Sequence, residues 1–246
     1  MRPLTQVAGL WRVGSFICAM KYASTNKEKL RWIGGALNDS SRTEYTLTTP
    51  MGTFLCPDVA SAYQFLPSWE VAVKAEITKL HDGVFVDIGA NIGFYSVMAV
   101  KKGNFVISVE PNFDAYRCLI LNLASATGNV FSEYSTFLSA AWDSRAKLLL
   151  RTSENTDISE ISDEGEKVEA YPADSFMRGR KPDLIKIDVE GSEFNVLLGL
   201  KQTIAFHHPK IIFEALTPEK LDPCRRLLKE RGYQVTKLDS TNYLAT

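Results

Sequence analysis

The feature that most constrains the fold is a series of short, continuous apolar runs separated by helical stretches. Such runs are typical of strands that are buried on both faces of a parallel sheet. Five of them follow one another: VFVDI at 84–88, FVISVE at 105–110, FLSAAW at 137–142, LIKID at 184–188 and IIFEA at 211–215. Helices are expected between them, near 93–102, 113–125, 192–206 and 218–231. This alternation predicts a doubly wound α/β fold, in which ligands bind beyond the carboxyl ends of the strands.

The chain before residue 68 follows a different pattern and is expected to be an N-terminal addition over 1–67, with the main domain over 68–246. Apolar residues recur at helical spacing from Leu10 to Met20, which predicts an amphipathic helix. The segment from Thr43 to Pro57 is rich in β-formers around a Pro-Met-Gly turn, which predicts a hairpin. A helix capped by Ser68 is expected to lead into the domain.

Two further segments have distinct compositions. Residues 152–167 are acidic and polar without apolar periodicity, so we expect an exposed loop there. The tail from Gly232 onward contains two β-like runs around Asp239 and Ser240, which predicts an antiparallel hairpin at the edge of the sheet.

Composition excludes several protein classes. Lys and Arg number 28 against 29 Asp and Glu, so a globally basic nucleic-acid binder is excluded. The four cysteines are scattered, which predicts neither a zinc site nor a disulfide scaffold. The apolar stretch near the start is interrupted by Arg12 and has no cleavage pattern, so neither a signal peptide nor a membrane span is expected. We expect a cytoplasmic enzyme.

The strongest local motif is VFVDIGANIGFYS, a buried strand that ends in Asp87 and runs into a glycine turn. Glycines at 89 and 93 let the backbone approach a ligand closely, and a helix follows the turn. The spacing is not the GxGxxG dinucleotide fingerprint. An acid directly before the turn would repel a pyrophosphate but suits an ammonium group. At the end of the next strand, Glu110 stands where an acid accepts hydrogen bonds from both ribose hydroxyls.

The third motif is LIKIDVEGSE, in which strand alternation puts Lys186, Asp188 and Glu190 on one side. Charged groups on a mainly buried strand are costly unless they are paired or used in function. A purely structural pair between Lys186 and one of the acids is the alternative. Glu214 adds another acid on the same rim of the sheet.

Four blocks of this sequence resemble the FkbM-type S-adenosylmethionine-dependent methyltransferases. They are VDIGANIGFYS at 86–96, VEPN at 109–112, LIKIDVEGSEFNVLLG at 184–199 and IIFE at 211–214. Their order and spacing are more specific than any single block. The resemblance covers roughly residues 68–246 and implies a class I methyltransferase with a Rossmann-like, doubly wound, seven-stranded sheet. Residues 1–67 remain a helical and hairpin addition.

The resemblance also implies roles for individual residues, with S-adenosyl-L-methionine as the cofactor and no assigned metal. The cofactor's ribose lies against Glu110, and its adenine amino group against Asp143. The cradle of its methionine part is formed by Asp87 and the turn with Gly89, Asn91 and Gly93, and Phe94 and Pro111 are further cofactor-binding residues. Asp188, Glu190 and Glu193 lie in the motif beside the transferred methyl group. Asp188 or Glu190 is the expected base, and Lys186 orients a carboxylate or the substrate.

The expected reaction is O-methylation of a hydroxyl on a sugar, glycan or polyketide-like metabolite. The sulfonium methyl is already activated, so the protein need only align the acceptor oxygen and remove its proton. Alternatively, Asp188, Glu190 and Glu214 could ligate a metal that acidifies a diol acceptor.

Two other functions fit parts of the sequence. A nicotinamide-dependent oxidoreductase is disfavoured by the missing GxGxxG turn. A non-catalytic or RNA-contacting module that retains the fold is a further alternative, because residues 1–31 carry an excess of basic residues. A small molecule or a glycan is the expected partner, and no strong nucleic-acid signal is present.

Overall fold

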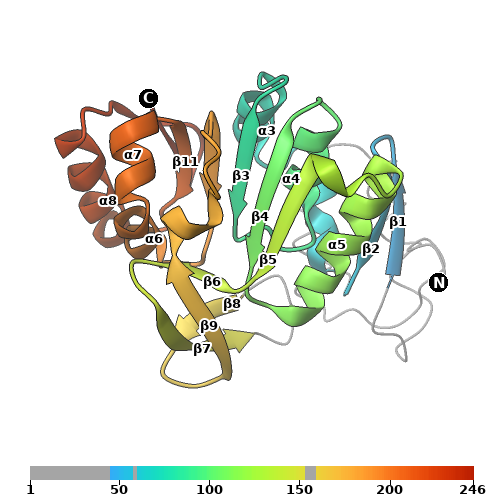
Figure 1. Ribbon diagram of the computed structural model, residues 1–246, viewed down its shortest axis with the longest axis horizontal. Helices are drawn as coiled ribbons and strands as arrows, with labels where there is room; N and C mark the ends of the chain where they lie inside the picture. The colour runs from blue at the N-terminus through green and yellow to red at the C-terminus, as the bar shows by residue number, and fades with distance from the viewer. Residues whose placement is uncertain (1–44, 58–59, 153–158) are drawn as a thin grey trace.

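The structure is a computed structural model that describes residues 45–57, 60–152 and 159–246. Its largest element is a seven-stranded mixed sheet (Figure 1). In spatial order the strands are β12 (Val235–Lys237), β13 (Asn242–Ala245), β11 (Lys210–Glu214), β10 (Leu184–Ile187), β3 (Val84–Ile88), β4 (Phe105–Glu110) and β5 (Tyr134–Leu138). The predicted α/β fold class is confirmed. The helix predicted from Leu10 to Met20 lies outside the described residues.

Five strands of this sheet run parallel, from β11 through β10, β3 and β4 to β5. Their carboxyl ends therefore meet at one edge, as the apolar runs predicted. The tail forms the antiparallel pair β12 and β13, of which β13 joins β11. This confirms the predicted terminal hairpin at the edge of the sheet.

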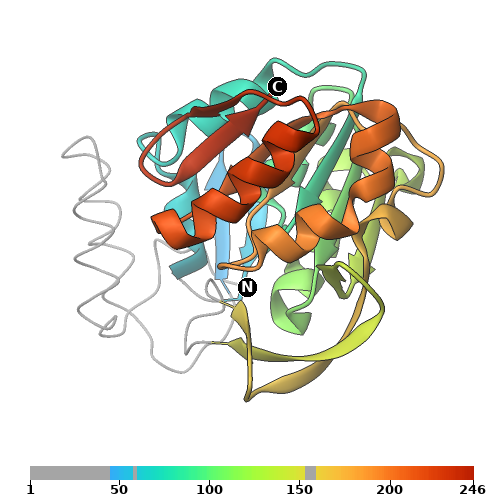
Figure 2. The same cartoon turned by 90° about the vertical axis from the view of Figure 1, so that its left-hand side faces the viewer.

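Helices cover both faces of the large sheet (Figures 1 and 2). One face packs against α3 (Val71–Thr78), α4 (Phe94–Val100) and α5 (Phe113–Thr127), and the other against α6 (Glu193–Gly199), α7 (Lys201–His207) and α8 (Pro218–Glu230). Because side chains alternate along a strand, Phe85 packs toward α4 whereas Val86 and Ile88 pack toward α6 and α8. Two hydrophobic cores result, one on each face.

The predicted hairpin before the domain is confirmed as β1 (Tyr45–Thr49) and β2 (Gly52–Cys56). Phe54 and its two successors are buried in the same core as α4 and α5. Asn122 of α5 clamps β2, since its side chain accepts from Leu55 N at 2.6 Å and donates to Leu55 O at 2.9 Å. The division of the chain at residue 67 stays a prediction, but the hairpin shares its core with the domain.

The run FLSAAW does not form one strand, so that prediction was wrong. It divides between β5 and β6 (Ala140–Trp142), which belong to different sheets. The second sheet has the order β6, β9 (Glu166–Pro172), β7 (Ala146–Thr152) and β8 (Ser159–Ser162). An apolar run gives no sign of a change of sheet, because the strand on either side of the change is equally apolar.

The loop predicted over 152–167 was also wrong for its described part, because β8 lies within it and β9 begins at Glu166. The side chains of β8 are all partly exposed, so the strand has no buried face that would produce alternation. The helix predicted from Ser68 begins instead at Val71 after Glu70. Three short 3-10 helices complete the described fold: η2 (Ala60–Phe65), η3 (Phe131–Glu133) and η4 (Ala173–Phe176).

Candidate functional site

A row of polar side chains crosses the middle of the large sheet beneath α4. The strand register places Asp87 of β3 directly between Lys186 of β10 and Ser108 of β4. Asp87 is buried and accepts a hydrogen bond from Ser96 of α4 at 2.6 Å, and Ser96 is 2.8 Å from the Ser108 hydroxyl. Burial raises the pKa of Asp87, although the nearby Lys186 opposes this. Asp87 is thus fixed at the base of the predicted ligand turn.

The turn after β3 passes close to the end of β10. Gly89 has a φ of 79°, and a β-carbon there would lie 1.7 Å from the carbonyl oxygen of Asp188. The N–H groups of Gly89 and Ala90 both donate to Val109 O, at 2.9 and 3.1 Å. Gly93 has a φ of 82° and precedes α4. The structure shows why glycine is needed at position 89, because the chain here passes against the backbone that follows β10. The predicted close approach of this turn to a ligand stays a prediction.

Glu110 is held by backbone donors at the carboxyl end of β4. Its Oε1 accepts from the N–H of Asn112 and its Oε2 from the N–H of Asn91, both at 2.8 Å. Burial raises the pKa of Glu110 to about 7, while these two hydrogen bonds lower it. The carboxylate is therefore oriented before any ligand binds.

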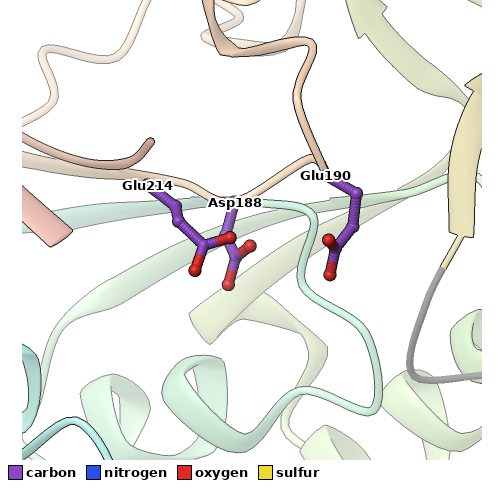
Figure 3. A group of neighbouring side chains, drawn as sticks. All are labelled: Asp188, Glu190 and Glu214. Carbon is purple, nitrogen blue, oxygen red and sulfur yellow. The ribbon is translucent and has the colours of Figure 1, made fainter. Parts of the chain in front are cut away.

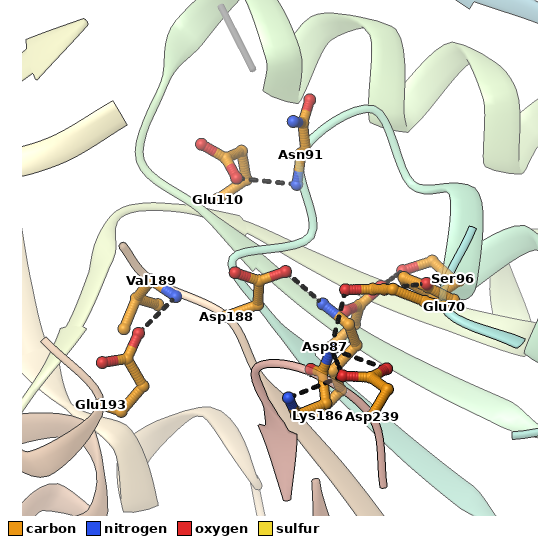
Figure 4. Close-up of polar contacts among 12 residues, drawn as sticks. Glu70, Asp87, Asn91, Ser96, Glu110, Lys186, Asp188, Val189, Glu193 and Asp239 are labelled. Atoms are coloured by element: carbon orange, nitrogen blue, oxygen red, sulfur yellow. Dashed lines mark hydrogen bonds and ion pairs between the residues drawn. The ribbon is translucent and has the colours of Figure 1, made fainter. Parts of the chain in front are cut away.

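Lys186 lies under the turn among three carboxylates (Figure 4). Its Nζ is 2.8 Å from Asp188 Oδ2 and 4.8 Å from the centre of the Tyr95 ring. Burial lowers the pKa of Lys186, but Asp188, Glu70 and Asp87 together raise it above its ordinary value. Lys186 is 2% exposed, so it is placed to hold Asp188 rather than to meet a substrate. The structural pairing left open by the sequence is present.

Sequence reasoning missed Glu70 and its partners. The Glu70 carboxylate accepts hydrogen bonds from Tyr95 Oη and from Asn242 Nδ2, the latter at 3.0 Å. Glu70 precedes α3, and Asn242 begins β13, so 172 positions separate them. No local pattern marks Glu70, because its role depends on which strands the fold brings beside α3.

Three carboxylates form a second group at the ends of β10 and β11, which we call the acidic rim: Asp188, Glu190 and Glu214 (Figure 3). One oxygen from each lies within 4.8 Å of the others. Burial raises the pKa of Glu214 to about 8, and the charges of Asp188 and Glu190 add to this. Carboxylate oxygens are hard ligands, so this group has the chemistry to hold either a proton or a divalent cation.

Asp143 follows β6 rather than β5. The register pairs Glu110 of β4 with Leu138, and the chain then enters β6 of the smaller sheet before it reaches Asp143. The Asp143 carboxylate accepts from Ser144 at 2.6 Å and from Asn195 of α6 at 2.9 Å, and these bonds lower its pKa. The structure thus groups Asp87, Glu110, Lys186, Asp188 and Glu190 but places Asp143 at the end of another sheet.

Comparison with known proteins identifies relatives of this fold. Residues 87–235 match the methyltransferase FkbM domain family. The hexuronic acid methyltransferase AglP of Haloferax volcanii is 29% identical over 127 residues, which are 50% of this chain and 52% of that protein. The chain therefore spans about half of the length of this relative.

Two solved structures show the same fold. Methyltransferase FkbM from Methylobacillus flagellatus KT has a TM-score of 0.54 and 19% identity, over 95% of this chain and 58% of its own. A SAM-dependent methyltransferase from Agrobacterium tumefaciens has a TM-score of 0.50 and 13% identity, over 84% of this chain and 70% of its own. Among the described residues, no helix has the length and apolar character needed to cross a membrane.

Proposed function

This chain belongs to the FkbM methyltransferase family, and from that premise we propose that it transfers a methyl group from S-adenosyl-L-methionine to a hydroxyl oxygen. The observation that carries the proposal is the convergence of three acids around one glycine turn. Asp87, Glu110 and Asp188 lie at the carboxyl ends of the three neighbouring strands β3, β4 and β10. The charges of Asp87 and Asp188 both raise the pKa of Glu110. We take the seven-stranded sheet to be the Rossmann-like arrangement of class I methyltransferases.

The residues at the turn fit the cofactor chemically. Two buried acceptor atoms, Asp87 Oδ1 and Asn91 Oδ1, have no hydrogen-bond partner among the described residues. Buried acceptors without donors are costly, and an ammonium group would supply the donors. The Glu110 carboxylate retains lone pairs beyond its two backbone bonds, which suit the two ribose hydroxyls. Phe94 and Pro111 flank these groups in the chain, and Asp143 is proposed to meet the adenine amino group.

When bound, S-adenosylmethionine supplies an activated methyl group, so the chain has to orient the acceptor and accept its proton. The acidic rim supplies the candidates. Lys186 orients Asp188 through the 2.8 Å ion pair. Glu214, with a pKa of about 8, keeps its proton at neutral pH. Asp188 or Glu190 therefore serves as the base near pH 7.

The acceptor is proposed to be a sugar, glycan or similar hydroxylated metabolite. The name of the relative AglP, a hexuronic acid methyltransferase, supports a sugar. We propose no metal requirement, and omission of divalent cations from the assay checks this. A nicotinamide-dependent oxidoreductase remains the rival function to be excluded by experiment.

Two measurements test the proposal. Calorimetric titration with S-adenosylmethionine should give saturable binding, and titration with NADH should give none. A panel of sugars, uronic acids and polyketide alcohols, incubated with the cofactor, should yield a product heavier by one methyl group in mass spectrometry. Binding of NADH without any response to S-adenosylmethionine would refute the proposed function.

A further inference from the structure

Asn112 occupies a junction between three parts of the molecule. It follows Glu110 and Pro111 and is the N-cap of α5, where its Oδ1 accepts from the N–H groups of Asp114 and Ala115, both at 3.0 Å. Its own N–H donates to Glu110 Oε1 at 2.8 Å. One residue thus begins the helix and orients the proposed ribose carboxylate.

The remaining group of Asn112 reaches the smaller sheet. Its Nδ2 donates to Thr152 Oγ1 and to Ser159 Oγ, both at 3.1 Å. Thr152 and Ser159 face each other as the last described pair of the β7 and β8 ladder. The side chain of Asn112 is 7% exposed, so loss of these partners would leave a buried amide donor unsatisfied.

We infer that Asn112 is a positioning residue that couples cofactor binding at Glu110 to the position of the β7 and β8 strand ends. The inference rests on the proposed function, because it requires a ligand at Glu110. A ligand that binds the Glu110 carboxylate reorients it, and this changes the hydrogen bond that Glu110 accepts from the N–H of Asn112. The side-chain amide of Asn112 is hydrogen-bonded to both β7 and β8. Because coupling is reciprocal, fixing the strand ends also favours the ligand-ready orientation of Glu110.

The β7 and β8 strand ends belong to a sheet that begins near the proposed cofactor site. The chain enters their sheet directly from the carboxyl end of β5, whose Leu138 pairs with Glu110. The smaller sheet therefore starts at the edge of the large sheet where the cofactor carboxylates lie (Figure 1). If these strand ends are held beside the cofactor, they form part of the surface that binds the methyl acceptor.

Hydrogen–deuterium exchange with S-adenosylhomocysteine as the ligand tests the coupling without any knowledge of the acceptor. In the unaltered protein, saturating ligand should slow exchange at Ala146–Thr152 and Ser159–Ser162 by about fivefold, the low end of typical coupling. Asn112→Ser keeps the N-cap oxygen and the backbone N–H but loses the amide. It should abolish this protection and weaken the calorimetric affinity for the ligand by up to about fivefold, the same factor, because the coupling is reciprocal.

A second variant removes the same two hydrogen bonds by changing their acceptors on β7 and β8. The double substitution Thr152→Val with Ser159→Ala leaves Asn112, α5 and Glu110 intact and should abolish the protection equally. Ser162→Ala, a matched change on the same strand whose hydroxyl contacts Glu164 N instead, should keep it. Combining the two link-breaking changes should have no additional effect, since either one removes the same hydrogen bonds.

The outcomes separate this inference from the proposed function. Binding of the ligand without protection of the two strands, or protection that survives Asn112→Ser, would overturn the coupling and leave the methyltransferase proposal standing. No binding heat at all would overturn the proposed function, and the coupling with it.

Discussion

The two halves of the site hold their carboxylates by different means. On the cofactor half, the Glu110 carboxylate is buried and bound by two backbone N–H groups at 2.8 Å. On the acidic rim, Glu190 and Glu214 are partly exposed and lie within 4.8 Å of Asp188. Two fixed backbone donors orient a single carboxyl group, whereas a cluster of like charges needs protons or cations to offset its repulsion. The cofactor half therefore suits binding of one fixed ligand, and the acidic rim suits proton transfer.

The largest expected effect comes from replacing Lys186, whose charge interacts with Asp87 in the cofactor half and with Asp188 in the acidic rim. Lys186→Met should reduce the free energy of unfolding by about 4 kcal/mol, because it leaves Asp188, Asp87 and Glu70 without their buried cation. Urea unfolding measures this. Lys79→Met, which removes an exposed ion pair with Glu76, should cost about 0.5 kcal/mol or less. Similar costs for the two variants would contradict the account of Lys186.

The next prediction concerns the glycine turn after β3, where Gly89 lies against the backbone of Asp188. Gly89→Ala should destabilise the protein by about 3 kcal/mol or more and remove measurable cofactor binding, because its β-carbon would overlap Asp188 O. Gly179→Ala provides the matched control, since Gly179 has a φ of 78° and no atom within 4 Å of the added carbon. It should cost about 1 kcal/mol, from backbone strain alone. Equal effects would show that contact with β10 is unimportant.

A third substitution separates catalysis from binding. Asp188→Asn should lower kcat about a hundredfold while the affinity for S-adenosylmethionine changes little, because a general base contributes to the chemical step. Glu190→Gln in parallel identifies which carboxylate accepts the proton. Glu214→Gln should have a small effect near pH 7, where Glu214 is already protonated. Unchanged turnover in Asp188→Asn would assign the base to Glu190.

The last prediction concerns how the Glu110 carboxyl group responds to pH. Burial raises the pKa of Glu110 from 4.5 to about 7, so the native protein keeps a proton that the unfolded chain loses between these values. This contribution to the free energy of unfolding should fall, by roughly 3 kcal/mol, as pH rises from 4.5 to 7. Cofactor affinity should rise through pH 7, since only the ionised carboxylate accepts both ribose hydroxyls.

The variant Glu110→Gln provides the control for this pH dependence. It should bind S-adenosylmethionine about tenfold more weakly at pH 8 and lose most of the change in affinity with pH. Calorimetry between pH 5.5 and 8.5 measures both quantities. A pH dependence that persists in Glu110→Gln would assign the titration to another group.

The parts of the fold that the sequence predicted correctly share one physical cause. Buried parallel strands such as VFVDI and IIFEA are apolar on both faces, so they are visible without knowledge of their neighbours. Their carboxyl ends converge by geometry alone, which is why the grouping of Asp87, Glu110 and Asp188 was predictable. By contrast, β8 was missed because its strand has two partly exposed faces and no apolar period.

What the sequence determined by itself was therefore local: where the central strands run, where the chain turns on glycine, and which acids end the strands. The tertiary structure decided the rest. It brought Tyr95 and Asn242 to Glu70, and it joined Asn112 to Thr152 and Ser159. These contacts link segments far apart in the chain, and each depends on the register between strands and on the packing of helices against the sheet. No local periodicity encodes such distances, since the same residues in another register would face different partners.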